Sequence, residues 1–318
     1  NTLSLEGLMS ATELSVELLP WQQEVWNDNT RFKVIAAGRR TGKSRLAAWM
    51  LIINALQSER GHVFYVAPTQ GQARDIMWQT LLELGHSVIV GSHINNLQIK
   101  LINGSMISLK GADRPETMRG VSLKFLVMDE YADMKPDVWE QVLRPALADQ
   151  KGSAMFIGTP MGRNHFYDLY QYGALGDDDT YKAWHFTSYD NETLDPDEIN
   201  LAKKSMSSFA FRQEFMASFE ELEDRYREFV SERDWEQFHT PKNLAEAISI
   251  ESGELLEVFL WHDNYDAEKV AVDTEIMQKV EEELADVVIY CLALASQLDI
   301  DITDAVEAKM ENNEERFD

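Results

Sequence analysis

The stretch FKVIAAGRRTGKS, Phe32–Ser44, decides the fold of the first two thirds of the chain. It opens with an apolar run, Phe32–Ala36, that is typical of a buried strand, and leads through a loop of glycine and arginine into Ser44–Leu56, which has the apolar spacing of a helix. A loop between a strand and a helix gathers backbone N–H groups and the helix N-terminus around one point. Such a point suits a chain of phosphates, so the stretch predicts a phosphate-binding loop.

Short apolar runs alternate with helical patterns around this loop, through residues 10–219. Strand and helix in alternation predict an α/β domain in which crossover helices join the strands of a parallel sheet. One departure is Leu97–Leu109, which predicts a β-hairpin with Asn103-Gly104 at its turn. The further elements expected are strands at Val63–Ala67, Ser87–Val90, Phe125–Met128 and Met155–Gly158 and a helix at Gln72–Leu84.

The side chains of the loop define its chemistry. Lys43 is expected to reach the β- and γ-phosphates of ATP, and the hydroxyl of Ser44 is expected to ligate Mg²⁺. The usual pattern has glycine where this chain has Ala37, but the flanking strand and helix outweigh that departure. The residues expected to bind ATP here are Gly38, Arg39, Arg40, Thr41, Gly42, Lys43 and Ser44.

A second signal is FLVMDE, Phe125–Glu130, an apolar strand that ends in two carboxylates. In an ATPase, Asp129 would hold Mg²⁺ through water, and Glu130 would position and deprotonate the attacking water. By itself the pair is equally well explained as an acidic surface turn after a strand. Together with the phosphate-binding loop it predicts a P-loop ATPase.

Four motifs together resemble the ATPase domain of the large terminase subunits of tailed phages, which feed DNA into the empty capsid. They are LPWQ at Leu19–Gln22, the loop GRRTGKS, the strand LVMDE and GTP at Gly158–Pro160. The resemblance covers about two thirds of the chain and includes the alanine at the start of the loop. It implies an ATPase with DNA, a portal protein and a small terminase subunit as partners.

The same resemblance assigns roles to individual residues. It implies that Gln22 reads adenine and that Thr159 couples hydrolysis to movement. It also implies that an arginine of the loop, Arg39 or Arg40, touches the γ-phosphate. Arg119, in the run MRG, is a candidate arginine finger for a neighbouring subunit, although an ordinary surface salt bridge explains it equally well.

The chain departs from the terminases after Phe219. The segment Asp195–Phe219 still resembles the helical end of the ATPase domain. Terminases then continue into a nuclease domain of the ribonuclease H type, built on an acidic metal cluster over a sheet, whereas residues 220–318 show no β-pattern. We therefore expect no nuclease and no DNA cleavage, which leaves packaging activity open.

Residues 220–318 predict an all-helical domain with an unusual arrangement of acids. Glu251 falls within the apolar stripe of its helix and Glu254 follows one turn later. Glu283 and Asp286 repeat this spacing on the next helix, beside an apolar stripe made of Val280, Leu284, Val287, Cys291 and Leu294. A carboxylate on a core-facing stripe is costly unless something pairs with it. Four carboxylates around a cation would solve this, and oxygen ligands favour Mg²⁺ or Mn²⁺ over zinc. Two solvated acidic faces are the equal alternative. The helices expected are Glu221–Glu232, Leu244–Trp261, Asp273–Leu298 and Ile302–Glu315.

The pattern ESGE followed by ELAD resembles the ExxE…ExxD motif of the MazG and dCTP pyrophosphatase family, and Arg233–His239 and Lys309–Asn313 resemble it too. The resemblance implies hydrolysis of a nucleoside triphosphate, a dNTP such as dCTP, to the monophosphate and pyrophosphate. It implies that the four acids bind Mg²⁺ and that one of them, for which we choose Glu254, activates the water. It also implies a dimer or a dimer of dimers. The nucleotide-binding residues expected are Trp235, His239, Asn243, Trp261, Lys309 and Asn313, with core packing as the alternative for the tryptophans and a helix-start role for the histidine.

The charge is unevenly distributed, which indicates two modules of different origin. The net charge is −26, and residues 221–318 alone, with 28 acidic and 8 basic residues, carry −20 of it. So acidic a module repels a nucleic acid backbone, so DNA is expected as a ligand of the first module only. The single cysteine, Cys291, and the lack of a signal peptide or membrane span predict a cytoplasmic protein without a membrane partner. Residues 1–9 are taken to be an added segment outside the fold.

Three interpretations are open. The first is a nucleotide pyrophosphohydrolase that carries an ATPase module. The second is a fragment of a packaging motor in which the helical module serves assembly only. The third is an interaction protein with one or both sites decayed, against which stands the presence of every key residue. No Gly/Ser-rich or Pro-rich linker marks the junction near residues 219–223, which leaves a natural and an engineered fusion both open.

Overall fold

The computed structural model describes residues 2–3, 14–219, 222–260, 273–300 and 302–317. Its contacts divide the chain into two compact units, Asn1–Glu220 and Glu221–Asp318. We describe each unit by itself. In the part of the chain that the structure describes, no helix is long and apolar enough to cross a membrane.

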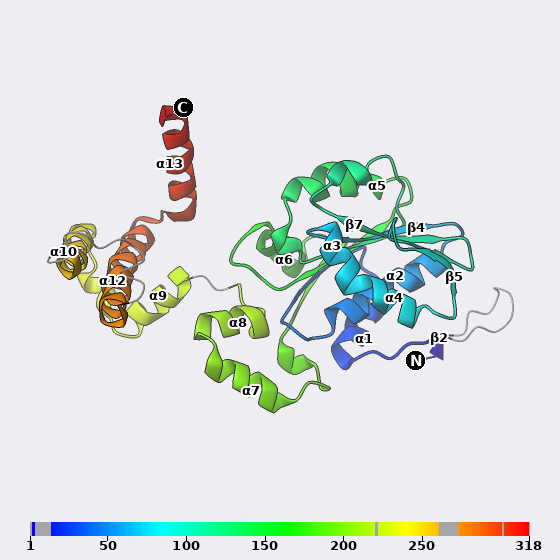
Figure 1. The fold of residues 1–318 in the computed structure, drawn as a ribbon, viewed down its shortest axis with the longest axis horizontal. Coiled ribbons are helices and arrows are strands. Elements are labelled where there is room, and N and C mark those ends of the chain that lie inside the picture. Colours follow the sequence, from blue (N-terminus) through cyan, green and yellow to red (C-terminus); the bar gives the residue numbers. More distant parts are fainter. Residues whose placement is uncertain (1, 4–13, 220–221, 261–272, 301, 318) are drawn as a thin grey trace. The chain divides into compact units, whose positions relative to one another are not determined.

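The first unit is built on an eight-stranded sheet of order β10-β3-β9-β8-β4-β7-β6-β5 (Figure 1). The strands from β10 to β7 in this order run parallel, and the pairs β5–β6 and β6–β7 are antiparallel. This confirms the expected α/β domain and its hairpin, whose turn glycine has a φ of +83°. The strands are β3 Phe32–Ala37, β4 His62–Ala67, β5 Ile89–His93, β6 Gln98–Leu101, β7 Met106–Gly111, β8 Phe125–Asp129, β9 Ser153–Gly158 and β10 Tyr181–Phe186, and a separate two-stranded sheet pairs β1 Thr2–Leu3 with β2 Leu14–Ser15.

Helices cover both faces of this sheet (Figure 1). One apolar cluster joins α1, α2 and α4 to the alternate side chains of the central strands, and a second cluster joins the turn η4 and α6 to the other side chains. Because successive side chains of a strand point to opposite faces, strands buried on both faces are apolar throughout, as β3 and β8 are. The helices and helical turns are α1 Pro20–Asn27, α2 Lys43–Leu56, α3 Gln70–Ala73, η1 Arg74–Trp78, α4 Gln79–Leu84, η2 Pro115–Met118, η3 Tyr131–Asp133, η4 Val138–Leu143, α5 Arg144–Ala146 and α6 His165–Leu175.

Two strands differ from the sequence prediction. The strand expected at Ser87–Val90 lies instead at Ile89–His93 and forms the antiparallel edge of the sheet, with mostly exposed side chains. The strand β10 was not predicted, because its sequence YKAWHF mixes charged and aromatic residues. It forms the opposite edge of the sheet and pairs in parallel with β3. Among the described residues no strand pairs with its other backbone edge.

The first unit ends in the turn η5 Ser188–Asp190 and the helices α7 Pro196–Ser205 and α8 Ser208–Met216. The second unit has helices and no strand in its described residues: α9 Leu222–Ser231, η6 Trp235–Phe238, α10 Pro241–Phe259, α12 Thr274–Leu298 and α13 Ile302–Phe317. Helix α10 packs along α12, and α9 also packs on α12, where Arg227 Nε donates to the hydroxyl of Ser296 at 2.9 Å. The helix α10 begins three residues earlier than expected because the Thr240 hydroxyl accepts from the N–H of Asn243 and caps it.

Candidate functional sites

The phosphate-binding loop lies between the end of β3 and the start of α2, as the sequence predicts. Its turn needs glycine at position 42, where φ is +95° and a Cβ would lie 2.8 Å from the Gln22 side-chain nitrogen. That nitrogen donates to the Gly42 carbonyl at 3.0 Å, and the Trp21 indole N–H donates to the Thr41 carbonyl at 3.1 Å. Helix α1 therefore supports the loop through two side-chain hydrogen bonds to its carbonyl groups. Gln22 is 1% exposed, and its role in reading adenine stays a prediction.

Lys43 of the loop lies close to Glu130, the residue that directly follows the strand β8. Lys43 Nζ donates to the Ala37 carbonyl and to the Thr159 hydroxyl, each at 2.8 Å, and lies 3.6 Å from Glu130 Oε1. The backbone N–H of Thr159 in turn donates to Glu130 Oε2 at 3.0 Å. Glu130 has a φ of +52°, a left-handed conformation that costs a non-glycine residue energy and that concentrates at active sites. Thr159 thus links the lysine to the carboxylate.

Asp129 is buried beside this group, with 2% of its surface exposed. The Tyr65 hydroxyl donates to Asp129 Oδ2, and the backbone N–H of Glu130 donates to Asp129 Oδ1 at 3.0 Å. Burial first, and then the charge of Glu130, raise the pKa of Asp129 to about 6, because both disfavour the ionised form of this carboxyl group. Two adjacent carboxylates in so enclosed a place fit a divalent cation. Sequence reasoning missed Tyr65, whose hydroxyl within an otherwise apolar strand was the available signal.

The other residues predicted for this site take different positions. Ser44 lies in the first turn of α2, next to Lys43. Arg39 and Arg40 are exposed on the loop, and Arg40 has a φ of +57°. Arg119 is exposed after the turn η2 and lines a cavity of 500 Å³ with residues of η3 and η4. Its exposure is compatible with either a partner subunit or solvent.

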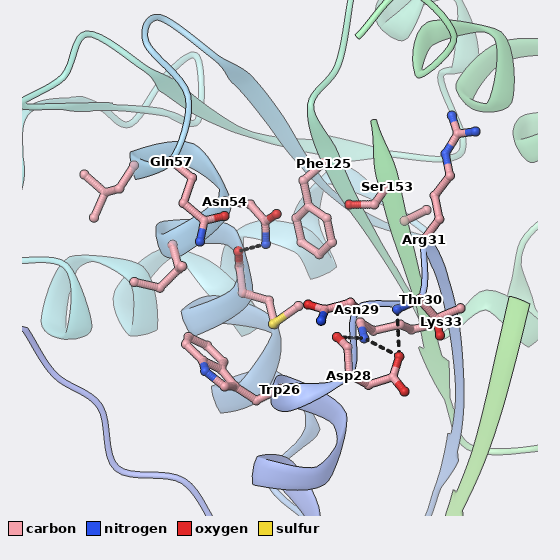
Figure 2. Close-up of a pocket in the computed structure, with 14 residues that line it drawn as sticks. Trp26, Asp28, Asn29, Thr30, Arg31, Lys33, Asn54, Gln57, Phe125 and Ser153 are labelled. Atoms are coloured by element: carbon pink, nitrogen blue, oxygen red, sulfur yellow. Dashed lines mark hydrogen bonds and ion pairs between the residues drawn. The ribbon is translucent and has the colours of Figure 1, made fainter. Parts of the chain in front are cut away.

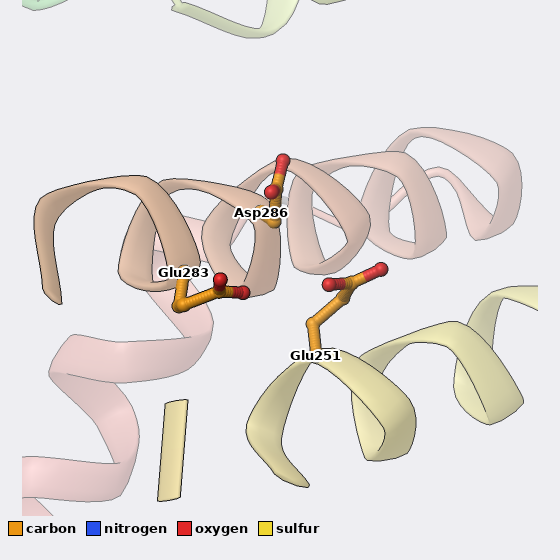
Figure 3. A group of neighbouring side chains, drawn as sticks. All are labelled: Glu251, Glu283 and Asp286. Atoms are coloured by element: carbon orange, nitrogen blue, oxygen red, sulfur yellow. The ribbon is translucent and has the colours of Figure 1, made fainter. Parts of the chain in front are cut away.

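In the second unit the structure brings three of the four predicted acids together. Glu251 on α10 faces Glu283 and Asp286 on α12, and carboxylate oxygens of all three lie within 4.8 Å of one another (Figure 3). Burial, and then the neighbouring carboxylates headed by Glu254, raise the pKa of both Glu251 and Glu283. Such mutual repulsion is what a bound cation would relieve. Glu254 lies outside the group of three but within its electrostatic reach.

The nucleotide-binding residues predicted for this unit are placed on other segments. His239 Nδ1 shares a hydrogen bond of 2.9 Å with the Tyr226 hydroxyl, and the Asn243 side chain donates to the Phe238 carbonyl at 2.9 Å. The Asn243 bond therefore stabilises the start of α10, and the His239 bond joins the segment before α10 to α9. Trp235 is 42% exposed. Lys309 and Asn313 lie on α13, and Trp261 lies outside the described residues.

A further cavity, of 390 Å³, lies at the opposite end of the sheet, beside the first residues of β3, β8 and β9 (Figure 2). Lys33 is buried there and donates to the carbonyls of Val25 and Asp28 and to Asp28 Oδ1, at 3.1, 2.6 and 3.3 Å. In parallel sheets, ligands bind at the carboxyl ends of the strands, where the phosphate-binding loop is. We therefore regard this cavity as part of the scaffold.

Fold and sites define two classes of protein on one chain: a P-loop ATPase unit, and a helical unit with paired acids of the pyrophosphohydrolase type. Comparison with known families agrees. The model of the family "Terminase large subunit, T4likevirus-type, N-terminal" matches residues 34–233, well over half of the chain, and the MazG-like family model matches residues 247–318. The chain belongs to this terminase large subunit family and carries a MazG-like domain. Both are hydrolase families that use divalent metal ions.

Individual relatives support each half. The large terminase subunit of Escherichia phage T5 is 33% identical over 201 residues, which cover 61% of this chain and 45% of that protein. The dCTP pyrophosphatase 1 of Mus musculus is 38% identical over 113 residues, which cover 36% of this chain and 66% of that protein. The chain thus spans less than half of the terminase and just under two thirds of the pyrophosphatase. In fold, the large terminase ATPase domain of Thermus phage P74-26 matches 65% of this chain with a TM-score of 0.60 at 23% identity and 96% coverage of that domain.

Proposed function

We propose that this chain hydrolyses two phosphoanhydrides at separate sites. The first unit would be an Mg²⁺-dependent ATPase, and the second an Mg²⁺-dependent pyrophosphohydrolase of nucleoside triphosphates, dNTPs and dCTP among them. The observation that carries the proposal is that each unit groups the charged side chains its chemistry requires: Lys43 linked through Thr159 to Glu130, and three facing carboxylates on α10 and α12.

In the ATPase site, Lys43 would hold the β- and γ-phosphates at the start of α2, whose N-terminus favours negative charge. Ser44 and Asp129 would hold Mg²⁺, which would neutralise charge that develops on the phosphates. Glu130 would accept a proton from the attacking water, and the N–H of Thr159 keeps that carboxylate oriented. Gln22, Arg39 or Arg40, and Arg119 would have the roles that the terminase resemblance implies.

In the helical site, Glu251, Glu283 and Asp286 would hold Mg²⁺, and Mn²⁺ fits the same oxygen ligands. The ion would polarise the α-phosphate. Glu254, one turn from Glu251, would take the proton of the water that attacks this phosphorus, with pyrophosphate as the leaving group. Trp235, His239, Asn243, Trp261, Lys309 and Asn313 are proposed to hold the base, sugar and phosphates.

A second copy of the chain is the partner proposed for the helical unit, in a dimer or a tetramer. Large apolar side chains are exposed along its helices, among them Leu256 at 66%, Leu284 at 49% and Met310 at 57%. Leu284 belongs to the apolar stripe predicted for its helix, so part of that stripe lacks cover from the described residues of one chain. Exposed apolar surface on this scale indicates a protein interface. For the first unit, DNA, a portal protein or a small terminase subunit would be the partners.

A product assay tests the proposal. With Mg²⁺ and a panel of dNTPs and ATP, the helical site should release monophosphate and pyrophosphate, and the ATPase site should release ADP and phosphate. Formation of ADP alone would favour the second candidate, a motor fragment whose helical unit serves assembly, which the exposed apolar side chains also support. Nicking of supercoiled plasmid by the pure protein would contradict the expected lack of nuclease activity.

A further inference from the structure

The phosphate-binding loop is clamped to the helix α8, which lies far along the chain. The backbone N–H of Arg39 donates to the carbonyl of Glu214 at 2.6 Å. A Cβ at Gly38 would collide with the carbonyl of Phe215, so the loop can approach the helix this closely only because residue 38 is glycine. These backbone contacts fix where the end of α8 sits relative to the loop.

The turn η5 and the residue after it hold the same part of the loop from another side. The Ser188 hydroxyl donates to the Arg39 carbonyl at 2.7 Å, and the Asn191 side chain donates to the Arg40 carbonyl at 2.6 Å. The backbone of the two arginines is therefore fixed by hydrogen bonds at residues 39 and 40. These backbone hydrogen bonds do not fix the directions in which the side chains of Arg39 and Arg40 point.

For Arg39, a side chain of α8 sets that direction. Arg39 Nε donates to Glu214 Oε2, while the Arg39 side chain is 65% exposed and that of Glu214 is 22% exposed. An ion pair so open to water adds little to the stability of a fold. It does fix a geometry, because Nε is the guanidinium donor nearest the backbone. The terminal nitrogens, which carry most of the N–H donors, lie outside this contact and are suited to phosphate oxygens.

Electrostatic interactions connect the Arg39–Glu214 pair to Glu130, the residue proposed to activate water. The hydrogen bond to Glu214 raises the pKa of Arg39, and the charge of Glu130 adds to the effect. Burial, followed by the charges of Glu130 and Glu214, raises the pKa of Asp133. Glu214 therefore acts on the same region as the carboxylate proposed to activate water.

We propose that Glu214 is a positioning residue of the ATPase site, which holds Arg39 by Nε and presents its terminal nitrogens to the last phosphate of ATP. This inference rests on the proposed ATPase function. Without Glu214 the guanidinium would be free to adopt other rotamers and would meet the phosphate in only a fraction of encounters. The loss should appear in the rate of the chemical step more than in the binding of ATP, because Lys43 and the loop backbone still bind the nucleotide.

Steady-state ATP hydrolysis by the full chain tests this. Glu214→Ala should lower kcat about tenfold and change KM by less than about threefold. Glu214→Gln keeps an oxygen for Nε without the charge and should retain part of the rate. The double variant Arg39→Ala/Glu214→Ala should be no slower than Arg39→Ala by more than about twofold, since Glu214 acts through Arg39. Glu198→Gln, an exposed acid on α7, is the matched control and should behave as wild type.

Two results would overturn the inference: a Glu214→Ala enzyme as fast as wild type, or losses from the two single variants that multiply in the double variant. Multiplying losses would mean that Glu214 affects the rate by a route other than Arg39. Failure of the proposed function looks different. In that case the wild-type chain itself would neither bind a fluorescent ADP analogue nor release phosphate from ATP, and the inference would fall with it.

Discussion

The two candidate sites differ in how much of each is enclosed by one polypeptide. In the ATPase unit, Lys43 is 9% and Asp129 is 2% exposed, and both make hydrogen bonds within their unit. In the helical unit, Glu251 and Glu283 are half-buried and Asp286 is exposed, on helices that also expose Leu256 and Leu284. The first site is enclosed by its own unit, whereas the second presents its acids on a surface that resembles an uncovered interface.

The two sites differ in enclosure because the two units differ in size. The ATPase unit surrounds an eight-stranded sheet with helices on both faces, which leaves room for buried charged groups and their partners. A unit of four long helices and a helical turn, in its described residues, has too little interior to do the same, and we propose that association gives it cover. We therefore expect the two activities to respond to different perturbations.

The largest expected effect comes from Lys43→Ala. Removal of the lysine takes away the charge that meets the β- and γ-phosphates, so phosphate release from ATP should fall by about 10³-fold. Pyrophosphate release from dCTP should stay within about twofold of wild type, because it takes place at the other site. A coupled assay for each product measures both, and loss of both products from this one change would contradict the two-site proposal.

The reciprocal change is Glu254→Ala. Loss of the proposed base should lower pyrophosphate release by about 10²-fold, in the range that removal of a general base costs. Phosphate release from ATP should be unchanged. Glu246→Ala, on the same helix and exposed, is the matched control, since its carboxylate pairs with Lys242 at 3.2 Å across one helical turn. An equal loss in both variants would point to the helix as a whole rather than to Glu254.

The ATPase site could largely be predicted from sequence because its parts are local. The strand, loop and helix that hold Lys43 are continuous, and the acids of β8 follow their strand directly. The bonds that refine the site join distant positions, Tyr65 with Asp129 and Arg39 with Glu214, and no local pattern encodes them.

The helical site shows a different limit. The spacing of the acids predicted that they would converge, and three of them do. The apolar spacing also placed Leu284 on a core face, yet it is 49% exposed. Periodicity shows which face of a helix is apolar, and it does not show whether the chain itself or a partner covers that face.

Leu256→Glu tests whether the exposed apolar surface of the helical unit is a protein interface. A charge on this exposed apolar position should weaken association, so the chain should sediment as a smaller species. Pyrophosphate release measured at low protein concentration should fall about tenfold or more, because a lone charge in a dry interface costs several kcal/mol. ATP hydrolysis should be unaffected. Leu175→Glu, at a 70% exposed position of α6, is the control, and a similar effect there would argue against a specific interface.

Asp28→Asn tests the charged scaffold at the far end of the ATPase sheet (Figure 2). Burial raises the pKa of Asp28, but hydrogen bonds from Lys182 and Thr30 and the charge of Lys33 outweigh it and hold the pKa well below its usual range. Its stabilisation is therefore present above about pH 4, the usual pKa of an unfolded aspartate, and is lost as the pH falls through the lower folded pKa.

At pH 7 the Asp28→Asn variant should be less stable by about 2 kcal/mol, since Lys33 remains buried without its counter-charge. Urea unfolding followed by tryptophan fluorescence measures this, and the difference from wild type should shrink steadily as the pH falls from about 4 toward the low folded pKa of Asp28. Asp75→Asn, whose carboxylate forms an exposed pair with Arg74, should change stability by less than about 0.5 kcal/mol. A difference for Asp28→Asn that is as large at about pH 2 as at pH 7 would mean that packing, not charge, is responsible.

The smallest expected effect is that of Tyr65→Phe, which removes one hydroxyl and keeps the ring in the core. Asp129 then loses its hydrogen bond from Tyr65 and keeps that from the Glu130 N–H. A group that orients a metal ligand typically affects metal affinity about tenfold, so half-maximal ATP hydrolysis should need about ten times more Mg²⁺, with kcat at saturating Mg²⁺ nearly unchanged. Tyr170→Phe, a half-buried hydroxyl on α6, should leave the Mg²⁺ dependence as it is. An unaltered Mg²⁺ dependence in Tyr65→Phe would show that Asp129 is held in place without the Tyr65 hydroxyl. Metal binding in the enclosed ATPase site would then depend on a single hydrogen bond no more than it does in the exposed helical site, where water can replace a lost donor.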